Sequence, residues 1–196
     1  MVHKNGWKAA KASGTLATKN YIFGAAFVAC AFTMLYASTG ETSIQVLVHT
    51  SGGDTFSLVL LLIGAMTQSA IWPFHKWLIS ALNSPTPVSA IMHAGLVNGG
   101  GFLLVRFAPL YFHHETLLSA IFVIGFTSAL LGMLWQLMQN DIKRMLACST
   151  MGQMGFMLAQ CGLGLFPLAV AHLVYHGMFK AYLFRASGAI AQEKRF

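Results

Sequence analysis

The sequence predicts an all-α, polytopic membrane protein: a bundle of about six transmembrane helices with one broken helix near Trp72 and Pro73. Of the 196 residues, 56% are apolar and only 9% are charged, whereas a soluble domain carries roughly 25% charged residues. The apolar residues form long runs, and most basic residues lie where those runs end. Such runs fit a bilayer as helices, because lipid offers no hydrogen-bond partner to an open backbone.

The charge balance sets the expected surroundings of the chain. Lys and Arg number 12 against 5 Asp and Glu, an excess that in a soluble protein would suggest nucleic acid. Here the basic residues occupy loop ends, which is the pattern of the positive-inside rule, so a lipid bilayer is expected and a nucleic-acid partner is not. With six crossings, one side collects the N-terminal arm, Lys76, Lys143, Arg144, Lys194 and Arg195, and only Arg106 falls on the other. Both termini are therefore predicted in the cytoplasm, on a multi-pass protein of the cell (inner) membrane.

The cysteines and the N-terminus point to no further processing or cofactor. Cys30, Cys148 and Cys161 lie inside apolar stretches without Cys-x-x-Cys spacing, so no disulfide framework, metal site or cofactor is predicted. The opening residues are basic, but no apolar region with a cleavage site follows soon enough for a signal peptide.

The predicted organisation has three parts. Residues 1–19 form a basic cytoplasmic arm, for which a short helix lying on the membrane surface is the alternative. Residues 20–191 form the transmembrane domain, and residues 192–196 a cytoplasmic end. The apolar segments are 21–37, 56–72, 86–107, 117–138, 145–166 and 168–191. Pro73 lacks an N–H and clashes with the preceding turn, so the segment that holds it is expected to be discontinuous.

The third segment follows a strong turn signal and carries unusual residues. Asn83-Ser-Pro-Thr-Pro87 predicts a turn and restart, with Pro87 in the first helical turn. Gly99-Gly-Gly101 indicates either close helix packing or a local opening, and packing is favoured. His93 is either a hydrogen-bonded packing residue or a proton carrier.

The fourth and fifth segments differ in polarity. Residues 117–138 contain no ionisable side chain and are expected to be a lipid-facing or scaffold helix. Asp141 is expected to cap the fifth helix. Lys143 either snorkels to the interface or turns inward to deliver protons. Beyond it, several polar residues could hold water in the bundle interior, namely Ser149, Thr150, Gln153 and Gln160.

The sixth segment carries the most informative pattern, because His172, His176 and Lys180 stand four residues apart. Each step turns about 400°, so the three residues form one stripe roughly 12 Å long on one helix face. A titratable residue in a membrane helix is costly and is a functional candidate. The stripe could bind a metal, although no acidic residue accompanies it. It could make structural hydrogen bonds, or it could be a hydrated proton relay, which is the favoured interpretation.

The chain resembles the antiporter-like subunits of respiratory complex I and of Mrp sodium/proton antiporters. The resemblance rests on Trp72-Pro-Phe-His-Lys-Trp-Leu78, on Ser84-Pro-Thr-Pro-Val-Ser-Ala-Ile-Met-His93, on Asp141-Ile-Lys-Arg-Met-Leu-Ala-Cys-Ser-Thr-Met151, and on the stretch from His172 to Ser187. Within that family, Asn83-Ser-Pro-Thr-Pro87 and the stretch from Gly95 to Pro109 look most like the DabB-type membrane subunits of bacterial inorganic-carbon uptake complexes. Those subunits pair with a large DabA-type subunit that resembles a carbonic anhydrase.

The resemblance implies an inverted-repeat antiporter fold and roles for matching residues. His93 matches the histidine after the Pro-Thr-Pro turn, and Lys143 matches a lysine near the central proton axis. The stripe His172, His176 and Lys180 matches the histidines and lysine of the next charged helix. The pattern departs where the family has a lysine in its broken helix, since here Gln68 stands and cannot hold a charge. The family's glutamate one helix earlier is also missing, so the chain is expected to be the middle of a longer subunit.

These observations lead to one functional hypothesis and two rivals. The hypothesis is a proton-conducting membrane subunit, not itself an enzyme, that couples proton flux to CO2 or bicarbonate uptake with a DabA-like partner. The first rival is a proton-pumping subunit of complex I or of an Mrp antiporter. The second is a non-conducting scaffold that anchors a soluble enzyme, which the absence of the lysine at Gln68 favours.

Overall fold

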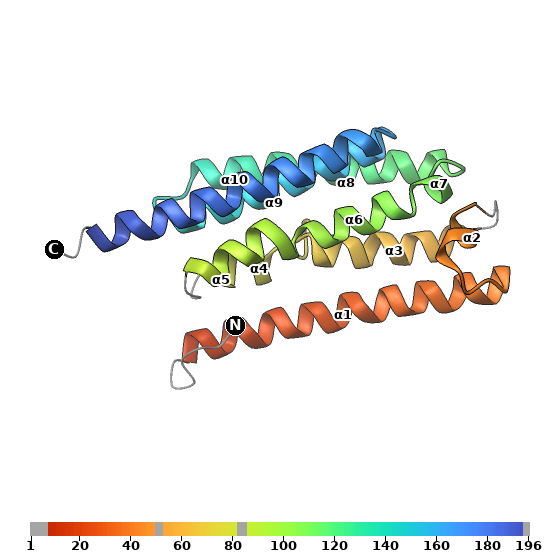
Figure 1. The fold of residues 1–196 in the computed structure, drawn as a ribbon, viewed down its shortest axis with the longest axis horizontal. Coiled ribbons are helices and arrows are strands. Elements are labelled where there is room, and N and C mark those ends of the chain that lie inside the picture. The colour runs from red at the N-terminus through yellow and green to blue at the C-terminus, as the bar shows by residue number, and fades with distance from the viewer. Residues whose placement is uncertain (1–7, 50–52, 82–85, 194–196) are drawn as a thin grey trace.

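The computed structural model describes residues 8–49, 53–81 and 86–193. The described chain is helical, and its long helices run roughly side by side along the length of the molecule (Figure 1). The elements in order are α1 (Lys8–Thr39), α2 (Ile44–His49), α3 (Thr55–Gln68), α4 (Lys76–Ser80), α5 (Thr86–Ile91), the π-helical turn η2 (Met92–Leu96), α6 (Asn98–Arg106), α7 (Ala108–Tyr111), α8 (Glu115–Leu137), α9 (Ile142–Gly162) and α10 (Phe166–Glu193).

The helices pack in an order that places α10 against the central elements. Helix α1 packs on α3, α3 packs on α6, and α9 lies between α8 and α10. Helix α10 also contacts α5, η2 and α6, so it closes one face of the bundle. The beginning of α1 and the end of α10 lie toward the same end of the molecule (Figure 1). We refer to it as the basic end, because α9 begins there with Lys143 and Arg144.

The first helix is longer than the sequence indicated. It begins at Lys8, so the described part of the predicted arm, residues 8–19, is helical and continuous with the first apolar segment. Ala10, Gly14 and Ala17 are buried and extend the small-residue face of α1 along the bundle. Alanine-rich sequence favours helix, and packing of this face carries the helix past the membrane-length segment. The predicted cytoplasmic end, residues 192–196, is only partly described, because the described part of α10 reaches Glu193.

The predicted break near Trp72 and Pro73 is confirmed. Helix α3 ends at Gln68, Ala70 adopts a left-handed φ of 53°, and α4 begins only at Lys76. Side chains satisfy the carbonyl groups that the break leaves open: the Thr67 carbonyl accepts from Asn20 Nδ2 at 2.9 Å and from Trp77 Nε1 at 3.1 Å. A broken helix is tolerated in a bilayer when the protein itself supplies such partners.

The third segment combines the two alternatives that its glycines offered. Pro87 lies in the first turn of α5, whereas the preceding turn residues 82–85 fall outside the described chain. A local opening is present as η2, just before the glycines. Close packing is also present, because a Cβ on Gly100 would meet the Ala65 carbonyl oxygen and one on Gly101 the Met157 sulfur. Glycine is therefore required at Gly100, where α6 crosses the backbone of α3, whereas at Gly101 the Met157 side chain of α9 packs close.

Helices α8 and α9 form a close antiparallel pair. A Cβ on Gly125 or Gly132 of α8 would meet backbone atoms of α9, and one on Gly155 would meet backbone atoms of α8. The outer face of α8 exposes large apolar side chains, among them Val123, Phe126, Leu130, Met133 and Leu134. This arrangement agrees with the scaffold or lipid-facing helix that the sequence predicted.

Three helical stretches in the described residues are long and apolar enough to cross a membrane. They are Lys8–Thr39, Pro87–Arg106 and Glu115–Leu137. Helix α3 is shorter, with 14 residues, while α9 and α10 are long but carry more polar residues. By length and apolarity alone, three of the about six predicted spans therefore qualify among the described residues. Several polar side chains of α9 and α10 are buried in the interior, namely Thr150, Gln160, His176 and Lys180, and the candidate site lies there.

Candidate functional site

The polar stripe of α10 faces into the bundle. Lys180 is 1% exposed and His176 is 5% exposed, while His172 is half-buried. Their spacing of four residues keeps them on the face that packs against α9 and the central helices. The opposite face exposes Met178 and Tyr182, as expected for contact with lipid. The burial agrees with the prediction that this stripe turns inward.

A chain of polar groups joins Lys180 to His93. The Lys180 Nζ donates to the Leu146 carbonyl oxygen at 2.9 Å. The same carbonyl accepts the Thr150 hydroxyl at 2.9 Å, and the Thr150 oxygen lies 3.3 Å from His93 Nδ1. Three helical elements thus meet through polar atoms: α10 through Lys180, α9 through Leu146 and Thr150, and η2 through His93.

These bonds assign the proton of His93. With the Thr150 hydroxyl donating to Leu146, the Thr150 oxygen accepts from His93 Nδ1 in the tautomer that carries its proton on Nδ1. The His93 ring is fully buried and stacks on Phe184 with 4.5 Å between centroids and 22° between planes. Its Nε2 has no hydrogen-bond partner among the described residues. In the neutral ring, Nε2 is therefore a buried proton acceptor.

A cavity of about 490 Å³ lies beside the stripe. Its lining includes His172, His176 and Lys180 of α10 together with Ser149 and Gln153 of α9. The His172 Nδ1 lies 3.2 Å from Gln160 Oε1, and the His172 and His176 ring centroids are 6.1 Å apart. Neither ring nitrogen of His176 has a hydrogen-bond partner among the described residues. A cavity of this size has room for several waters beside the polar side chains that line it.

Not every predicted site residue joins this cluster. Lys143 is half-buried two turns before Thr150 on the same face of α9, at the basic end. It does not line the cavity beside α10. Gln68 lies elsewhere: at the end of α3, its Nε2 donates to the Leu96 carbonyl oxygen at 3.1 Å. Gln68 therefore bonds the broken helix to η2 instead of facing the cavity beside α10.

Sequence reasoning missed two contributors to the cluster. The Leu146 carbonyl is the atom on which Lys180 and Thr150 converge, yet an apolar residue gives no signal of such a role. Phe184 stands four residues after Lys180 and covers the face of His93, a position that the stripe's own spacing could have suggested. Asn98, whose Nδ2 donates to the Leu173 carbonyl at 3.3 Å, ties α6 to α10 nearby.

The titratable groups of the cluster are histidine and lysine nitrogens, which can exchange protons. In the described residues there is no group of three or more His, Cys, Asp or Glu side chains placed to hold a metal ion. Two histidines line the α10 cavity together with a lysine, two hydroxyl or amide side chains and aromatic walls. Such groups can accept, hold and pass protons when water connects them.

Comparison with known proteins identifies the class. A family described as NADH:quinone oxidoreductase/Mrp antiporter, TM, matches residues 1–195. The chain therefore belongs to this family of antiporter-like subunits, and it is a multi-pass membrane protein.

Particular relatives of the chain include inorganic-carbon transporter subunits. A probable inorganic carbon transporter subunit DabB1 of Halothiobacillus neapolitanus is 52% identical over 136 residues, which cover 69% of this chain and 24% of that protein. A probable DabB subunit of Bacillus anthracis is 41% identical over 198 residues, covering 95% of this chain and 38% of that protein. This chain is thus homologous to DabB subunits and spans well under half their length.

A solved structure shows the same fold. A chain in the Mrp complex from Dietzia sp. DQ12-45-1b superposes with a TM-score of 0.86 at 29% identity. The match covers 96% of this chain and 22% of that chain. The sequence prediction of an antiporter-like membrane subunit is confirmed at this level.

Proposed function

We propose that this chain is part of a proton-conducting subunit that couples proton flux to CO2 or bicarbonate uptake, together with a DabA-type partner. The observation that carries the proposal is the connected interior cluster of Lys180, Leu146, Thr150 and His93, with His176 and its cavity alongside. The DabB relatives support the inorganic-carbon assignment. The carbon substrate and the partner belong to the whole complex.

The cluster suggests how protons pass. A proton reaches His176 or Lys180 through water in the cavity, because both side chains line it. The Leu146 carbonyl holds the Lys180 ammonium but cannot itself carry a proton onward. Transfer to His93 therefore needs the ammonium to release its proton, through water, to the bare Nε2. Lys143, on the same face of α9, is proposed to feed this cluster from the basic end.

The available energy is adequate for the proposed coupling. One charge moved through about 100 mV releases about 2.3 kcal/mol. That energy shifts a hydration or uptake equilibrium by more than about tenfold. The subunit needs only to prevent proton passage that is not linked to the partner's step.

Lys180 offers the sharpest test. Lys180→Met keeps a similar volume and removes the buried charge, so assembly should persist while proton-coupled activity is lost. Lys180→Arg should also fail, because a guanidinium keeps its proton at any relevant pH. The measurement is growth in air of a carbon-uptake-deficient host carrying the complete subunit and its partner, with assembly checked by pull-down.

The outcome separates a relay from a structural hydrogen bond. Arginine can still donate to the Leu146 carbonyl, so a purely structural Lys180 would be rescued by Lys180→Arg. Growth of Lys180→Arg at the parent rate would rule out the relay role.

The two rivals predict different partners and fluxes. A complex I or Mrp subunit would copurify with other membrane subunits of those assemblies, and the family description and the Mrp fold support that alternative. A non-conducting scaffold, favoured by Gln68 at the family's lysine position, would assemble normally yet pass no protons in reconstituted vesicles. Copurification of the intact complex followed by a proton-flux assay distinguishes all three.

A further inference from the structure

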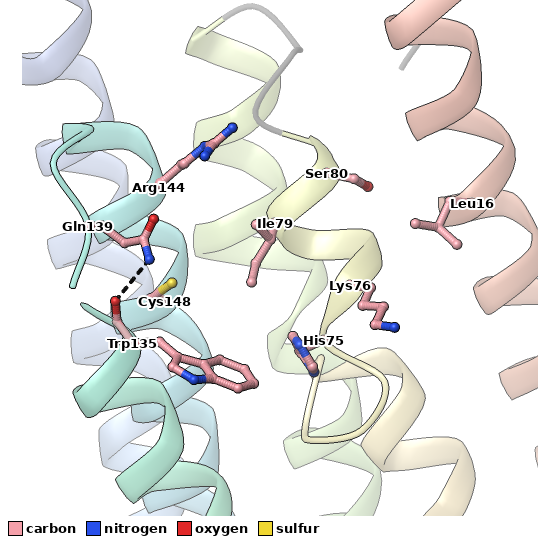
Figure 2. A pocket seen from close by; sticks show the side chains of 9 residues that line it. All are labelled: Leu16, His75, Lys76, Ile79, Ser80, Trp135, Gln139, Arg144 and Cys148. Atoms are coloured by element: carbon pink, nitrogen blue, oxygen red, sulfur yellow. Dashed lines mark hydrogen bonds between the residues drawn. The ribbon is translucent and has the colours of Figure 1, made fainter. Parts of the chain in front are cut away.

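A second cavity lies at the basic end and shares no lining residue with the cavity beside α10. Its volume is about 640 Å³. Figure 2 shows Trp135 of α8, Gln139 of the connection and Arg144 of α9 on one side of the cavity. On the other side lie His75, in the turn before α4, and Ile79 of α4. The proposed proton relay does not use this space.

The polar part of the cavity is cationic. Lys76 and Arg144 line it, and no carboxylate does so among the described residues. The nearby Asp141 caps α9 by accepting the Arg144 backbone N–H at 3.0 Å, which leaves the guanidinium side chain out of that bond. Two cations facing a space without an acid favour an anionic occupant.

His75 and Trp135 form one wall of the cavity. The two rings lie 4.8 Å apart, centroid to centroid. The His75 side chain is only 9% exposed, and its Nδ1 is buried out of contact with the cavity space. This wall is therefore largely aromatic and suits the apolar part of an occupant.

The remaining walls favour a lipid over a small free anion. Leu16, Ile79, Trp135 and Cys148 give the cavity an apolar side. Its volume far exceeds the roughly 30 Å³ that one water occupies, so a small ion would leave apolar surface in contact with water. Basic pockets between transmembrane helices near the membrane surface suit anionic lipid headgroups, and Trp is common at that depth.

We propose that this cavity binds an anionic glycerophospholipid, with the phosphodiester beside the Arg144 guanidinium at the basic end and the upper acyl chain running deeper along Ile79 and Leu16. Phosphatidylglycerol has these features. The proposal is independent of proton conduction and of the identity of the partner subunit.

The test uses the intact complex, purified in detergent, stripped of lipid and examined by native mass spectrometry. Phosphatidylglycerol should bind in preference to phosphatidylcholine, whose headgroup has no net charge and no hydroxyl. Arg144→Gln and Lys76→Gln should each weaken phosphatidylglycerol binding about fivefold, the value of one cation near an anionic lipid surface. Both side chains are exposed, and Arg144→Gln keeps the backbone N–H that Asp141 caps, so folding should persist.

Matched controls keep the result interpretable. Arg106→Gln removes an exposed cation at the end of α6, outside the cavity, and should leave phosphatidylglycerol binding unchanged. Ile79→Trp keeps every charge but fills the apolar side, and should also reduce binding. Glycerophosphate, which carries the headgroup chemistry without acyl chains, should not compete at lipid concentrations.

Three results would overturn the proposal. Equal binding of phosphatidylcholine would show a general lipid contact, and full binding by Arg144→Gln and Lys76→Gln would remove the cations from the site. Full competition by glycerophosphate or inorganic phosphate would identify a free-anion site instead of a lipid site.

Discussion

At the residue scale, the site is built from ordinary polar groups whose value comes from where they are buried. Lys180 is nearly inaccessible and donates to a backbone carbonyl, not to a carboxylate. Its hydrogen bond therefore holds the ammonium in place without a fixed counter-charge. Thr150 connects the same carbonyl to His93, so one hydroxyl determines which nitrogen of that ring donates.

Replacing Thr150 tests this connection. Thr150→Val has nearly the same shape but leaves His93 Nδ1 without its acceptor, so proton flux should fall about tenfold, the equivalent of losing about 1.4 kcal/mol of hydrogen bonding. Thr150→Ser keeps the hydroxyl and should conduct like the parent. The measurement is acidification of vesicles that contain the reconstituted complex, followed with a pH-sensitive dye. Equal flux in Thr150→Val and the parent would make His93 a packing residue.

At the scale of elements, close backbone contact fixes α9, the helix that carries Leu146 and Thr150. Two glycines on this helix differ in the space around them. A Cβ on Gly155 would meet the Ala129 backbone nitrogen and lie 2.8 Å from the Gly125 carbonyl oxygen. A Cβ on Gly152 would find its nearest neighbour, the Met133 nitrogen, at 3.4 Å, an ordinary contact.

The pair makes a controlled test of helix packing. Gly155→Ala should destabilise the protein by about 1–3 kcal/mol, because backbone on α8 must shift to admit the methyl group. Gly152→Ala should be neutral or stabilise by up to about 1 kcal/mol, since alanine favours helix. Thermal unfolding of the purified complex measures both. Equal melting temperatures for the two variants would contradict the close α8–α9 contact.

At the scale of the whole molecule, the basic helix ends and the proposed lipid cavity lie at the same end. The basic end gathers the start of α1, the start of α9 and the end of α10 (Figure 1). The connection between α6 and α8, with Arg106 before it, lies toward the other end (Figure 1). If the positive-inside bias holds, the lipid cavity faces the cytoplasmic leaflet, where anionic lipid is attracted to basic side chains.

Cysteine labelling tests this orientation. In a background with Cys30 replaced by Ala, His113→Cys should react with a membrane-impermeant maleimide on intact cells, and Asn140→Cys only after the membrane is permeabilised. Both positions are exposed, and they lie in the connections before and after α8. The remaining cysteines, Cys148 and Cys161, are buried and should stay unlabelled. The reverse pattern would place the basic end outside.

The sequence by itself determined the features that depend on local chemistry. Long apolar runs predicted a membrane bundle, Pro73 predicted the broken helix because it has no N–H to donate, and four-residue spacing placed His172, His176 and Lys180 on one helix face. The structure and the family match bear out these features, while the relay role remains a proposal.

Only the tertiary structure decided which groups meet across helices. Composition placed the boundary between the basic arm and the first apolar segment at residue 19. In the structure α1 already begins at Lys8, and Ala10, Gly14 and Ala17 pack against the bundle. Gln68 had the right family position but bonds to Leu96, and Leu146 had no polar signal but accepts from Lys180. A backbone carbonyl is the same in every residue, so its role depends on which side chains folding brings within hydrogen-bond distance.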